Sequence, residues 1–205
     1  MAQITHGVRA ILSHPFIYSS FQSLMGAHKA RQSFVADFVK PFPGMKVLDI
    51  GCGPADILAY LSDVDYAGFD ISEDYISQAR QKFKKRGDFH CKQLEATDLE
   101  SLPSFDVVFA LGLLHHLDDA VAIGVMQLAL KALKPGGRLL TIDPCLDPLQ
   151  NPIAGFLVRR DRGQNVRDKA GYETLARAVF GFSRIEIRHK LWIPYTHCFM
   201  ECTRT

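Results

Sequence analysis

The sequence has no large excess of charge of either sign. Its 24 lysines and arginines stand against 22 aspartates and glutamates, so the formal net charge is +2 at pH 7. Proteins that hold nucleic acid or an anionic membrane surface by general electrostatic attraction carry a larger positive excess. We therefore expect no nucleic-acid partner and no membrane partner, and any cationic binding surface must be local.

Long apolar runs and paired cysteine motifs are also missing. No segment approaches the roughly 20 consecutive apolar residues of a membrane-spanning helix. The apolar part of residues 1–15 is too short for a signal peptide. The five cysteines form no C-x-x-C pair and have no matching histidine cluster, which argues against a disulfide framework and against a structural metal. We expect a cytoplasmic protein without a bound metal.

What the sequence does contain is an alternation of strand and helix patterns. Its 205 residues, 47% of them hydrophobic, suit one globular domain with a small cap. The alternation predicts an α/β fold with a doubly wound, mostly parallel sheet and helices on both faces. The expected strands are residues 46–50, 66–70, 88–94, 105–111 and 138–143.

Three helices are expected between these strands. Pro54 suits the first turn of the first helix, and Ser72 is expected to cap the second. The third is expected to stop before the glycines of residues 134–137. The apolar face of the first helix would consist of Ile57, Leu58 and Leu61, that of the second of Ile76, Ala79 and Phe83, and that of the third of Leu117, Val121, Val125, Leu128 and Ala132.

Both ends of the chain depart from this alternation. Residues 16–39 are expected to be helical, and residues 171–180 to form a late helix followed by two strands, the first ending near Lys190. These signals predict an N-terminal helical extension or cap over residues 1–43 and a main domain over residues 44–205. Within the main domain, residues 145–170 are expected to form a lid over the substrate.

The stretch VLDIGCGPADIL, residues 47–58, places Gly51 and Gly53 directly after the first strand. Without Cβ atoms, backbone can approach a ligand closely and adopt unusual dihedral angles. A tight turn with no ligand is the alternative. Asp70 ends the second strand, where adenosine-binding folds place an acid on the ribose hydroxyls; alternatively it only accepts from the amides of the next helix.

A third glycine is missing from this turn. Ala55 and Asp56 occupy the region where a dinucleotide fingerprint has that glycine, and Asp49 lies just before the turn. A carboxylate at this place would repel a pyrophosphate but would suit an ammonium group. The turn therefore favours a cationic nucleoside that bears an amino acid over a dinucleotide.

Four segments in this order resemble the class I S-adenosylmethionine-dependent methyltransferases. They read VLDIGCGPA, GFDIS, FDVVFALGLLHHL and LKPGGRLLTID, and they lie between about residues 44 and 143. The resemblance implies a Rossmann-like fold in which a final antiparallel strand is inserted into the parallel sheet. It also implies S-adenosyl-L-methionine as the cofactor and S-adenosyl-L-homocysteine as its product.

The resemblance further implies which residues hold the methionine part of the cofactor. Leu111 would offer its backbone carbonyl to the amino group, and Arg31 would meet the carboxylate; alternatively Arg31 is a solvated helix residue. The other residues implied at the methionine part are Asp49, Gly51, Cys52 and Gly53.

The nucleoside part is assigned in the same way. Asp70 would bind the ribose, and Ile71 would cover one face of the adenine. Glu95 and Ala96 stand where the family reads the adenine edge, but the family usually has an aspartate at the position of Glu95. Thr97, through its hydroxyl, or Asp98 is the alternative contact for the adenine amino group.

Three histidines are candidate general bases. His115 and His116 follow the fourth strand, near where the reactive methyl group should lie, and a neutral imidazole there could remove a proton from the acceptor. Alternatively one of the pair only packs or caps the next helix. His197, with Tyr195 two residues before it, is expected at a turn that faces the same site; its alternative is a satisfied strand residue.

The acceptor is expected to contact the lid. Arginines gather there, which suits a carboxylate or phosphate on the acceptor, although a solvated loop would also be charged. The sequence predicts a methyltransferase acting on a small molecule; the alternatives are a macromolecular acceptor, or a protein that binds the cofactor without turnover. The cationic residues of the lid are Arg159, Arg160, Arg162, Arg167 and Lys169, of which the first three, with Tyr195, are the candidate acceptor contacts.

Overall fold

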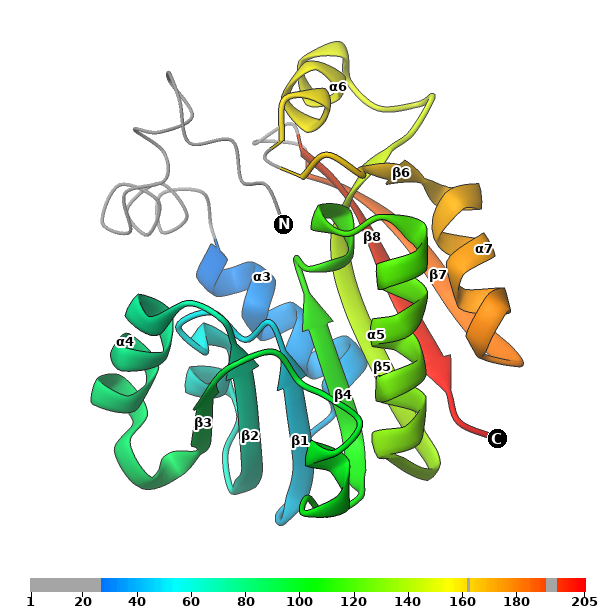
Figure 1. Cartoon of the computed structure of the whole chain (residues 1–205). Coiled ribbons are helices and arrows are strands. Elements are labelled where there is room, and N and C mark those ends of the chain that lie inside the picture. The colour runs from blue at the N-terminus through cyan, green and yellow to red at the C-terminus, as the bar shows by residue number, and fades with distance from the viewer. Residues whose placement is uncertain (1–26, 162, 191–194) are drawn as a thin grey trace.

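The computed structural model describes residues 27–161, 163–190 and 195–205. Within these residues, eight strands form one mixed sheet in the order β3-β2-β1-β4-β5-β8-β7, and β6 pairs with β5 beside it (Figure 1). The strands are β1 (Met45–Ile50), β2 (Val64–Asp70), β3 (Asp88–Cys91), β4 (Phe105–Leu111), β5 (Leu133–Leu146), β6 (Arg167–Asp168), β7 (Phe182–Lys190) and β8 (Tyr195–Thr203).

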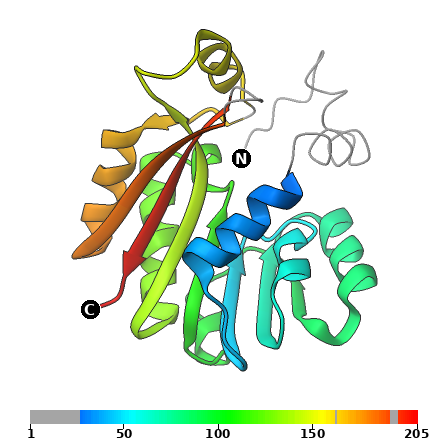
Figure 2. The same cartoon turned by 180° about the vertical axis from the view of Figure 1, so that it is seen from behind.

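Helices cover both faces of this sheet, as expected for a doubly wound fold (Figures 1 and 2). One face packs against α5 and α7, and the other against α3, η1, η2 and α4. The helices are α3 (Ala27–Phe34), η1 (Val35–Val39), η2 (Asp56–Tyr60), α4 (Glu73–Phe83), η3 (Lys84–Arg86), η4 (Asp98–Glu100), η5 (Leu114–His116), α5 (Asp119–Ala132), α6 (Pro152–Arg159) and α7 (Lys169–Val179).

The sheet has the strand directions that the sequence implied. β3, β2, β1, β4 and β5 are parallel to their neighbours. β8, the last strand of the chain, is antiparallel to both β5 and β7 and lies between them. The expected final antiparallel strand, inserted into a mostly parallel sheet, is confirmed.

Four strands differ in length from the expectation: β1 and β2 begin one and two residues earlier, and β3 and β5 differ more. β3 ends at Cys91 rather than Leu94, although Leu94 remains buried in the core. β5 begins at Leu133, directly after α5, so residues 134–137 belong to the strand instead of preceding it. The helix stop expected there is confirmed, because α5 ends at Ala132. β4 lies between β1 and β5, and its interior residues are buried, as its continuous apolar sequence predicted.

The helices after β1 and β4 differ from their predicted form. The first is only the five-residue 3₁₀ helix η2, and Ala55 adopts a left-handed conformation (φ 55°) directly before it. Its expected apolar residues are nonetheless buried. The face of α5 differs in part: Val121 is 42% exposed, whereas Val125 and Leu128 pack partly buried against the core and Ala132 is buried as expected. The buried residues of α5 are Ala122, Met126, Ala129 and Ala132.

α4 agrees with its prediction in detail. The Ser72 hydroxyl accepts a hydrogen bond from the backbone N–H of Tyr75 at 3.4 Å, as an N-cap does. The three residues expected to face inward, Ile76, Ala79 and Phe83, are all buried. α4 thereby fixes the position of Asp70, which lies two residues before its cap.

The described part of the N-terminal segment packs on the sheet. Phe34 and Phe38 share an apolar cluster with Val107 and Phe109 of β4, and Arg138 donates to the carbonyl of Phe38 at 2.9 Å. The helix expected over residues 16–39 is observed from residue 27 onward, and residues 1–26 lie outside the described part. The boundary between residues 43 and 44 stays a prediction.

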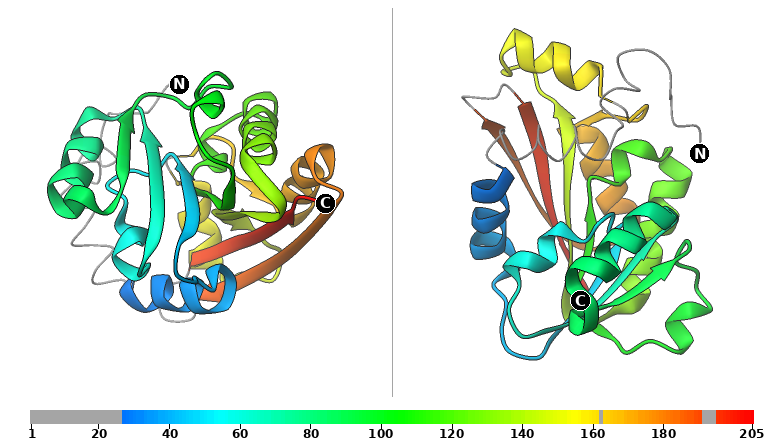
Figure 3. Two further views of the ribbon diagram at one scale, coloured as in Figure 1. Left: turned by 90° about the horizontal axis from the view of Figure 1, so that it is seen from below. Right: turned by 90° about the vertical axis from the view of Figure 1, so that its left-hand side faces the viewer.

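The segment over residues 145–170 extends beyond the carboxyl ends of the parallel strands, and α6 lies at its far side (Figure 3). α6 buries small residues, Ala154 and Gly155, and leaves Ile153 and Phe156 exposed. Among the described residues, no helix is both long enough and apolar enough to cross a bilayer. The position of this segment suits the predicted lid, whose function stays a prediction.

Candidate active site

The glycine turn lies where the carboxyl ends of β1 and β2 meet. Gly51 and Gly53 both adopt the left-handed conformation, with φ 73° and 53°. A Cβ at Gly51 would stand 3.0 Å from Leu113 Cδ1, whereas one at Gly53 would meet no atom within 4 Å. Gly51 is therefore required by its backbone and by its neighbour, while the side of Gly53 is open to a ligand.

Asp70 connects this turn to α4. Its Oδ2 accepts from the Gly53 N–H and its Oδ1 from the Ser72 N–H, both at 2.8 Å. Asp70 thus does accept hydrogen bonds from backbone amides, which was the alternative to a ribose contact. Each carboxylate oxygen has a second lone pair, so the ribose hydroxyls can still be bound, and that role stays a prediction.

Asp49 is a buried carboxylate with one satisfied oxygen. Only 2% of the residue is exposed, and Oδ2 accepts from the Tyr66 hydroxyl at 2.6 Å. Burial raises the pKa of Asp49 to about 7, opposed by the Tyr66 hydrogen bond and reinforced by the charge of Asp70. Oδ1 has no hydrogen-bond partner among the described residues. A ligand ammonium group would supply the missing donor.

The residues expected at the adenine lie at the same edge of the sheet. Ile71, directly after β2, is 59% exposed. Residues 95–97, between β3 and β4, are exposed as well. Asp98 holds this loop, because Oδ2 accepts from the Glu95 N–H at 2.9 Å and Oδ1 from the Lys92 ammonium. Each oxygen of Asp98 thus accepts one bond and keeps a second lone pair, and the adenine contacts of residues 95–98 stay predictions.

The two remaining candidates at the methionine part are also in reach of this edge. Leu111 is the last residue of β4 and is half-buried. Arg31 of α3 donates to Asp56 Oδ2 at 3.2 Å, and Lys82 donates to the other oxygen of Asp56 at 2.7 Å. This ion pair holds Arg31 beside η2, which begins three residues after Gly53. Its contact with a cofactor carboxylate stays a prediction.

His115 lies between two carboxylates. Its Nδ1 is 2.9 Å from Asp143 Oδ1, and its Nε2 is 3.2 Å from Asp161 Oδ1. The backbone N–H of His115 also donates to Asp143 Oδ1, at 3.1 Å. Tyr195 donates its hydroxyl proton to the other oxygen of Asp161. His115 and Asp143 are buried, and η5, β5, β8 and the lid all contribute to one polar cluster.

These contacts make His115 a cation at neutral pH. Burial lowers its pKa, but the hydrogen bonds and charges of Asp143 and Asp161 outweigh burial and raise the pKa to about 9. Burial likewise works against the charge of Asp161, yet the donors His115, Gly163 and Tyr195 bring its pKa well below the usual range. This arrangement of the lid favours the charged imidazole over the neutral one expected for His115, and its role as a base stays a prediction.

The other two histidines adjoin the same cluster. The ring centroids of His115 and His116 are 4.0 Å apart, and those of Tyr195 and His197 are 5.0 Å apart. The structure thus brings together the three candidate bases and the candidate acceptor contact Tyr195. Their catalytic roles stay predictions.

The backbone of the lid packs directly on His115. The Asn165 N–H donates to the His115 carbonyl at 3.0 Å, and the Gly163 N–H donates to Asp161 Oδ1 at 3.0 Å. A Cβ at Gly163 would stand 2.1 Å from His115 Cδ2. Only glycine permits the lid to approach His115 this closely.

The cationic residues of the lid do not form one cluster. Arg159 and Arg160 are exposed, and the Arg160 guanidinium lies 4.3 Å from the ring centroid of Phe156. Arg162 lies outside the described residues. Arg167 turns inward: it donates to the carbonyls of Leu114, Leu117 and Asn165 and to Asp119. Arg167 therefore anchors the lid, and only Arg159 and Arg160 remain as described candidates for an acceptor anion.

Sequence reasoning missed three residues of this site: Tyr66, Asp143 and Asp161. Tyr66 could have been found from the sequence. It lies two residues before Gly68 and on the same face of β2, so its ring can lie beside the glycine turn. Asp143 could also have been found, because it comes directly after an apolar run of β5, as Asp70 does in β2. Asp161 lies among the arginines of the lid, where its sequence position gives no sign of a contact with His115.

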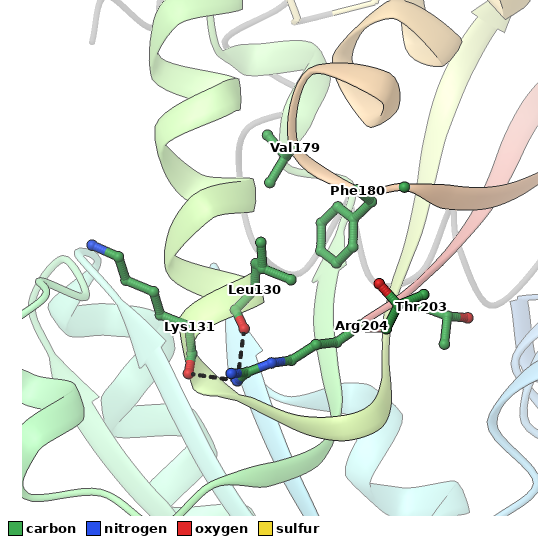
Figure 4. Close-up of a pocket in the computed structure, with 8 residues that line it drawn as sticks. Leu130, Lys131, Val179, Phe180, Thr203 and Arg204 are labelled. Atoms are coloured by element: carbon green, nitrogen blue, oxygen red, sulfur yellow. Dashed lines mark hydrogen bonds between the residues drawn. The ribbon is translucent and has the colours of Figure 1, made fainter.

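A hollow of about 310 Å³ at the opposite end of the sheet is a separate feature. Figure 4 shows Leu130 and Lys131 of α5 beside Val179 and Phe180, with Arg204 reaching across. Arg204 donates to the carbonyls of Leu130 and Lys131 at 3.2 and 3.3 Å. These bonds satisfy free carbonyls at the end of α5. Arg204 therefore has a structural role here, and we assign no ligand to this hollow.

The charge of His115 predicts a loss of stability in alkaline solution. Because folding raises the pKa of His115 from 6.5 to about 9, its contribution is complete below pH 6.5 and is lost as the pH rises through 9. We expect the free energy of unfolding to fall between pH 7 and pH 10 by about 3 kcal/mol more in the wild type than in His115→Gln. Urea unfolding at both pH values measures this difference.

Asp161→Asn provides the matched variant for this experiment. It removes one of the two charges on His115, so the alkaline loss of stability should begin at a lower pH than in the wild type. Parallel pH profiles for the wild type and His115→Gln would show that His115 is not a cation in the folded protein.

A sequence comparison decides the family. A family profile described as a methyltransferase domain matches residues 48–139. The match begins in β1, contains the glycine turn, Asp70 and His115, and ends in β5. The chain belongs to the class I S-adenosylmethionine-dependent methyltransferases.

The chain matches only part of the length of its curated relatives in this family. Phosphoethanolamine N-methyltransferase 3 of Arabidopsis thaliana is 31% identical over 170 residues, which are 78% of this chain and 33% of that protein. Ubiquinone biosynthesis O-methyltransferase of Idiomarina loihiensis is 32% identical over 124 residues, 58% of this chain and 50% of that protein. The chain thus spans a third to a half of the length of these relatives.

A solved structure of another methyltransferase agrees with the fold. The plantazolicin methyltransferase BamL, in complex with a triazolic desmethylPZN analog and SAH, has a TM-score of 0.64 and 14% sequence identity. The match covers 95% of this chain and 93% of BamL. At this identity the likeness concerns the fold, and it confirms the Rossmann-like architecture.

Proposed function

We propose that the chain transfers the methyl group of S-adenosyl-L-methionine to a small-molecule acceptor and releases S-adenosyl-L-homocysteine. The observation that carries the proposal is the buried Asp49 beside the glycine turn, whose Oδ1 has no partner among the described residues. A cofactor with an ammonium group fits this site better than a pyrophosphate. BamL, solved with SAH, and relatives named as methyltransferases of small compounds support the assignment.

The residues that would hold the cofactor lie along one edge of the sheet. Asp49 would bind the ammonium group and Asp70 the ribose hydroxyls, while the open side of Gly53 would let backbone approach the ligand. When bound, the sulfonium of the cofactor supplies an activated methyl group. The protein must then hold the acceptor in line with that methyl group and exclude water. The lid over His115 suits this task.

Removal of a proton from the acceptor requires a neutral base. Both ring nitrogens of His115 face carboxylates, Asp143 at 2.9 Å and Asp161 at 3.2 Å, which favours a role in holding the lid over that of a proton acceptor. We therefore assign the base to His116 or His197, which adjoin the cluster. Arg159 and Arg160, exposed on the lid, would meet an acceptor carboxylate or phosphate.

The five cysteines bear on the compartment. All five are free thiols, three of them buried. Thiols persist in a reducing environment. We therefore assign the protein to the cytoplasm.

The proposal predicts both binding and turnover. Calorimetry should detect binding of S-adenosylmethionine and S-adenosylhomocysteine to the wild type, and weaker binding to Asp49→Asn, which lacks the negative charge. Incubation with methyl-deuterated cofactor and a metabolite extract should release S-adenosylhomocysteine and label one small product, found by mass spectrometry. No binding would overturn the cofactor assignment. Binding without any labelled product would indicate a non-catalytic protein, and label confined to added RNA or protein would indicate a macromolecular acceptor.

A further inference from the structure

We propose that Tyr66 is a positioning residue for cofactor binding, which orients Asp49 toward the cofactor's ammonium group through its hydroxyl, and that Gly68 makes this contact possible. The inference rests on the proposed function, because it assigns the cofactor's ammonium group to Asp49. It adds two residues of β2 that lie outside the glycine turn.

The register of β1 and β2 explains how Tyr66 reaches Asp49. Tyr66 lies opposite Val47, and Gly68 lies opposite Asp49. Tyr66 and Gly68 are two residues apart and so share one face of the sheet. The Tyr66 ring therefore extends along β2 to reach Asp49 Oδ2, with which its hydroxyl makes a 2.6 Å hydrogen bond. Both side chains are buried.

Gly68 is needed because it has no side chain where Tyr66 and Cys52 pack. It does not adopt a left-handed conformation, so its backbone would accept another residue. A Cβ at Gly68, however, would stand 3.0 Å from Tyr66 Cε1 and 2.9 Å from Cys52 Sγ. Any side chain there would displace the Tyr66 ring or the Cys52 side chain of the glycine turn.

Packing alone does not require the hydroxyl of Tyr66. The ring contacts Phe89, with 5.9 Å between centroids, in an apolar cluster that phenylalanine would fill as well. The hydroxyl fixes Oδ2 of Asp49 and leaves Oδ1, which has no partner among the described residues. A carboxylate held in this way presents one defined oxygen to a ligand donor.

The same hydrogen bond helps Asp49 to remain charged. The titratable groups that face Asp49 are Tyr66 and Asp70 from β2 and Cys52 from the glycine turn. Asp70 is negative, and burial keeps the pKa of the Cys52 thiol well above its usual range, so Cys52 is neutral. Of these three groups, Tyr66 alone donates to the carboxylate and favours its charged form. Without this bond, more of Asp49 would be protonated at neutral pH.

Tyr66→Phe tests the inference with two ligands. S-adenosylhomocysteine carries the ammonium group, whereas 5′-methylthioadenosine has the same nucleoside without it. At pH 7 the variant should bind S-adenosylhomocysteine about tenfold more weakly than the wild type does, with 5′-methylthioadenosine affinity unchanged. The difference in S-adenosylhomocysteine affinity between the two proteins should become smaller at higher pH, where Asp49 ionises in both. Calorimetry over a range of pH measures all four affinities.

Three variants complete the test. Gly68→Ala should show the same selective loss, because its Cβ displaces Tyr66. Tyr66→Phe should have no further effect on S-adenosylhomocysteine binding once Asp49→Asn is present. Tyr172→Phe is the matched control: it also removes a buried hydroxyl, bonded to the Pro144 carbonyl at 2.9 Å, but on the other face of the sheet, and it should leave the ratio of the two affinities unchanged.

The outcomes separate this inference from the proposed function. If the wild type binds S-adenosylhomocysteine and Tyr66→Phe weakens both ligands equally, Tyr66 has only a packing role. Unchanged affinity for both ligands would also overturn the inference. If the wild type binds neither ligand, the proposed function itself fails.

Discussion

Replacement of Asp70 by alanine should weaken S-adenosylhomocysteine binding by about 100-fold, the largest loss that we expect from a single change in the cofactor site. Two effects act together. The ribose hydroxyls lose a charged acceptor, and the Gly53 and Ser72 amides lose the carboxylate that joins the glycine turn to α4. Calorimetry of the wild type and Asp70→Ala measures the sum of both.

A modified ligand separates the ribose contact from the support of the turn. The wild type should bind S-adenosylhomocysteine more tightly than its 2′-deoxy analogue, since the analogue lacks one hydroxyl. Asp70→Ala should bind the two ligands equally, because no carboxylate remains to distinguish them. Asp74→Asn, an acid in the first turn of α4, is the control and should retain the preference. A full preference in Asp70→Ala would show that Asp70 only supports the turn.

The sheet could be predicted from the sequence because its strands are short apolar runs with clear ends. β4 was located to the residue, since a strand buried on both faces is apolar throughout. The helix after β1 was predicted less well. Ile57, Leu58 and Leu61 are spaced as in a helix, but the left-handed Ala55 is followed by a 3₁₀ segment that ends at Tyr60. Nothing in residues 54–58 distinguishes the two outcomes, because the conformation of Ala55 depends on the packing of the turn.

The candidate residues of the cofactor edge could be grouped from the sequence more readily than the polar cluster at His115, for a physical reason. Asp49, the glycines and Asp70 lie within two neighbouring strands and the turn after the first, so their sequence order determines their proximity. The polar cluster at His115 joins η5, β5, β8 and the lid, which are distant in the chain. Its charges depend on that assembly: the two carboxylates that make His115 a cation are 28 and 46 residues away.

Arg167 illustrates that composition alone does not give the role of a charged residue. The sequence groups it with the other arginines of the lid, which suits an acceptor anion. In the structure its side chain is only 10% exposed, and its guanidinium contacts carbonyls of η5 and of its own lid segment. Its charge therefore serves the attachment of the lid, and an acceptor anion would have to meet Arg159 or Arg160.

Replacement of Arg167 by alanine should consequently destabilise the fold by about 3 kcal/mol, the largest loss of stability that we expect from a change in the lid. The carbonyls of Leu114, Leu117 and Asn165 each lose a donor 2.8 to 2.9 Å away. The ion pair with Asp119 adds little, because Asp119 is 77% exposed. Urea unfolding measures the change, and Arg160→Ala, an exposed arginine of the same lid, should change stability by less than about 0.5 kcal/mol.

Arg167→Lys tests whether geometry or charge matters at this position. A single ammonium group cannot reproduce the fork of a guanidinium that serves several carbonyls at once, so lysine should recover only a minor part of the lost stability. An anion-binding role predicts the opposite pattern: Arg167→Ala would keep its stability and lose acceptor affinity, and lysine would restore that affinity. Because His115 is held by the same lid, Arg167→Ala should also weaken the alkaline loss of stability that His115 confers, which links the anchor of the lid to the charge of the site.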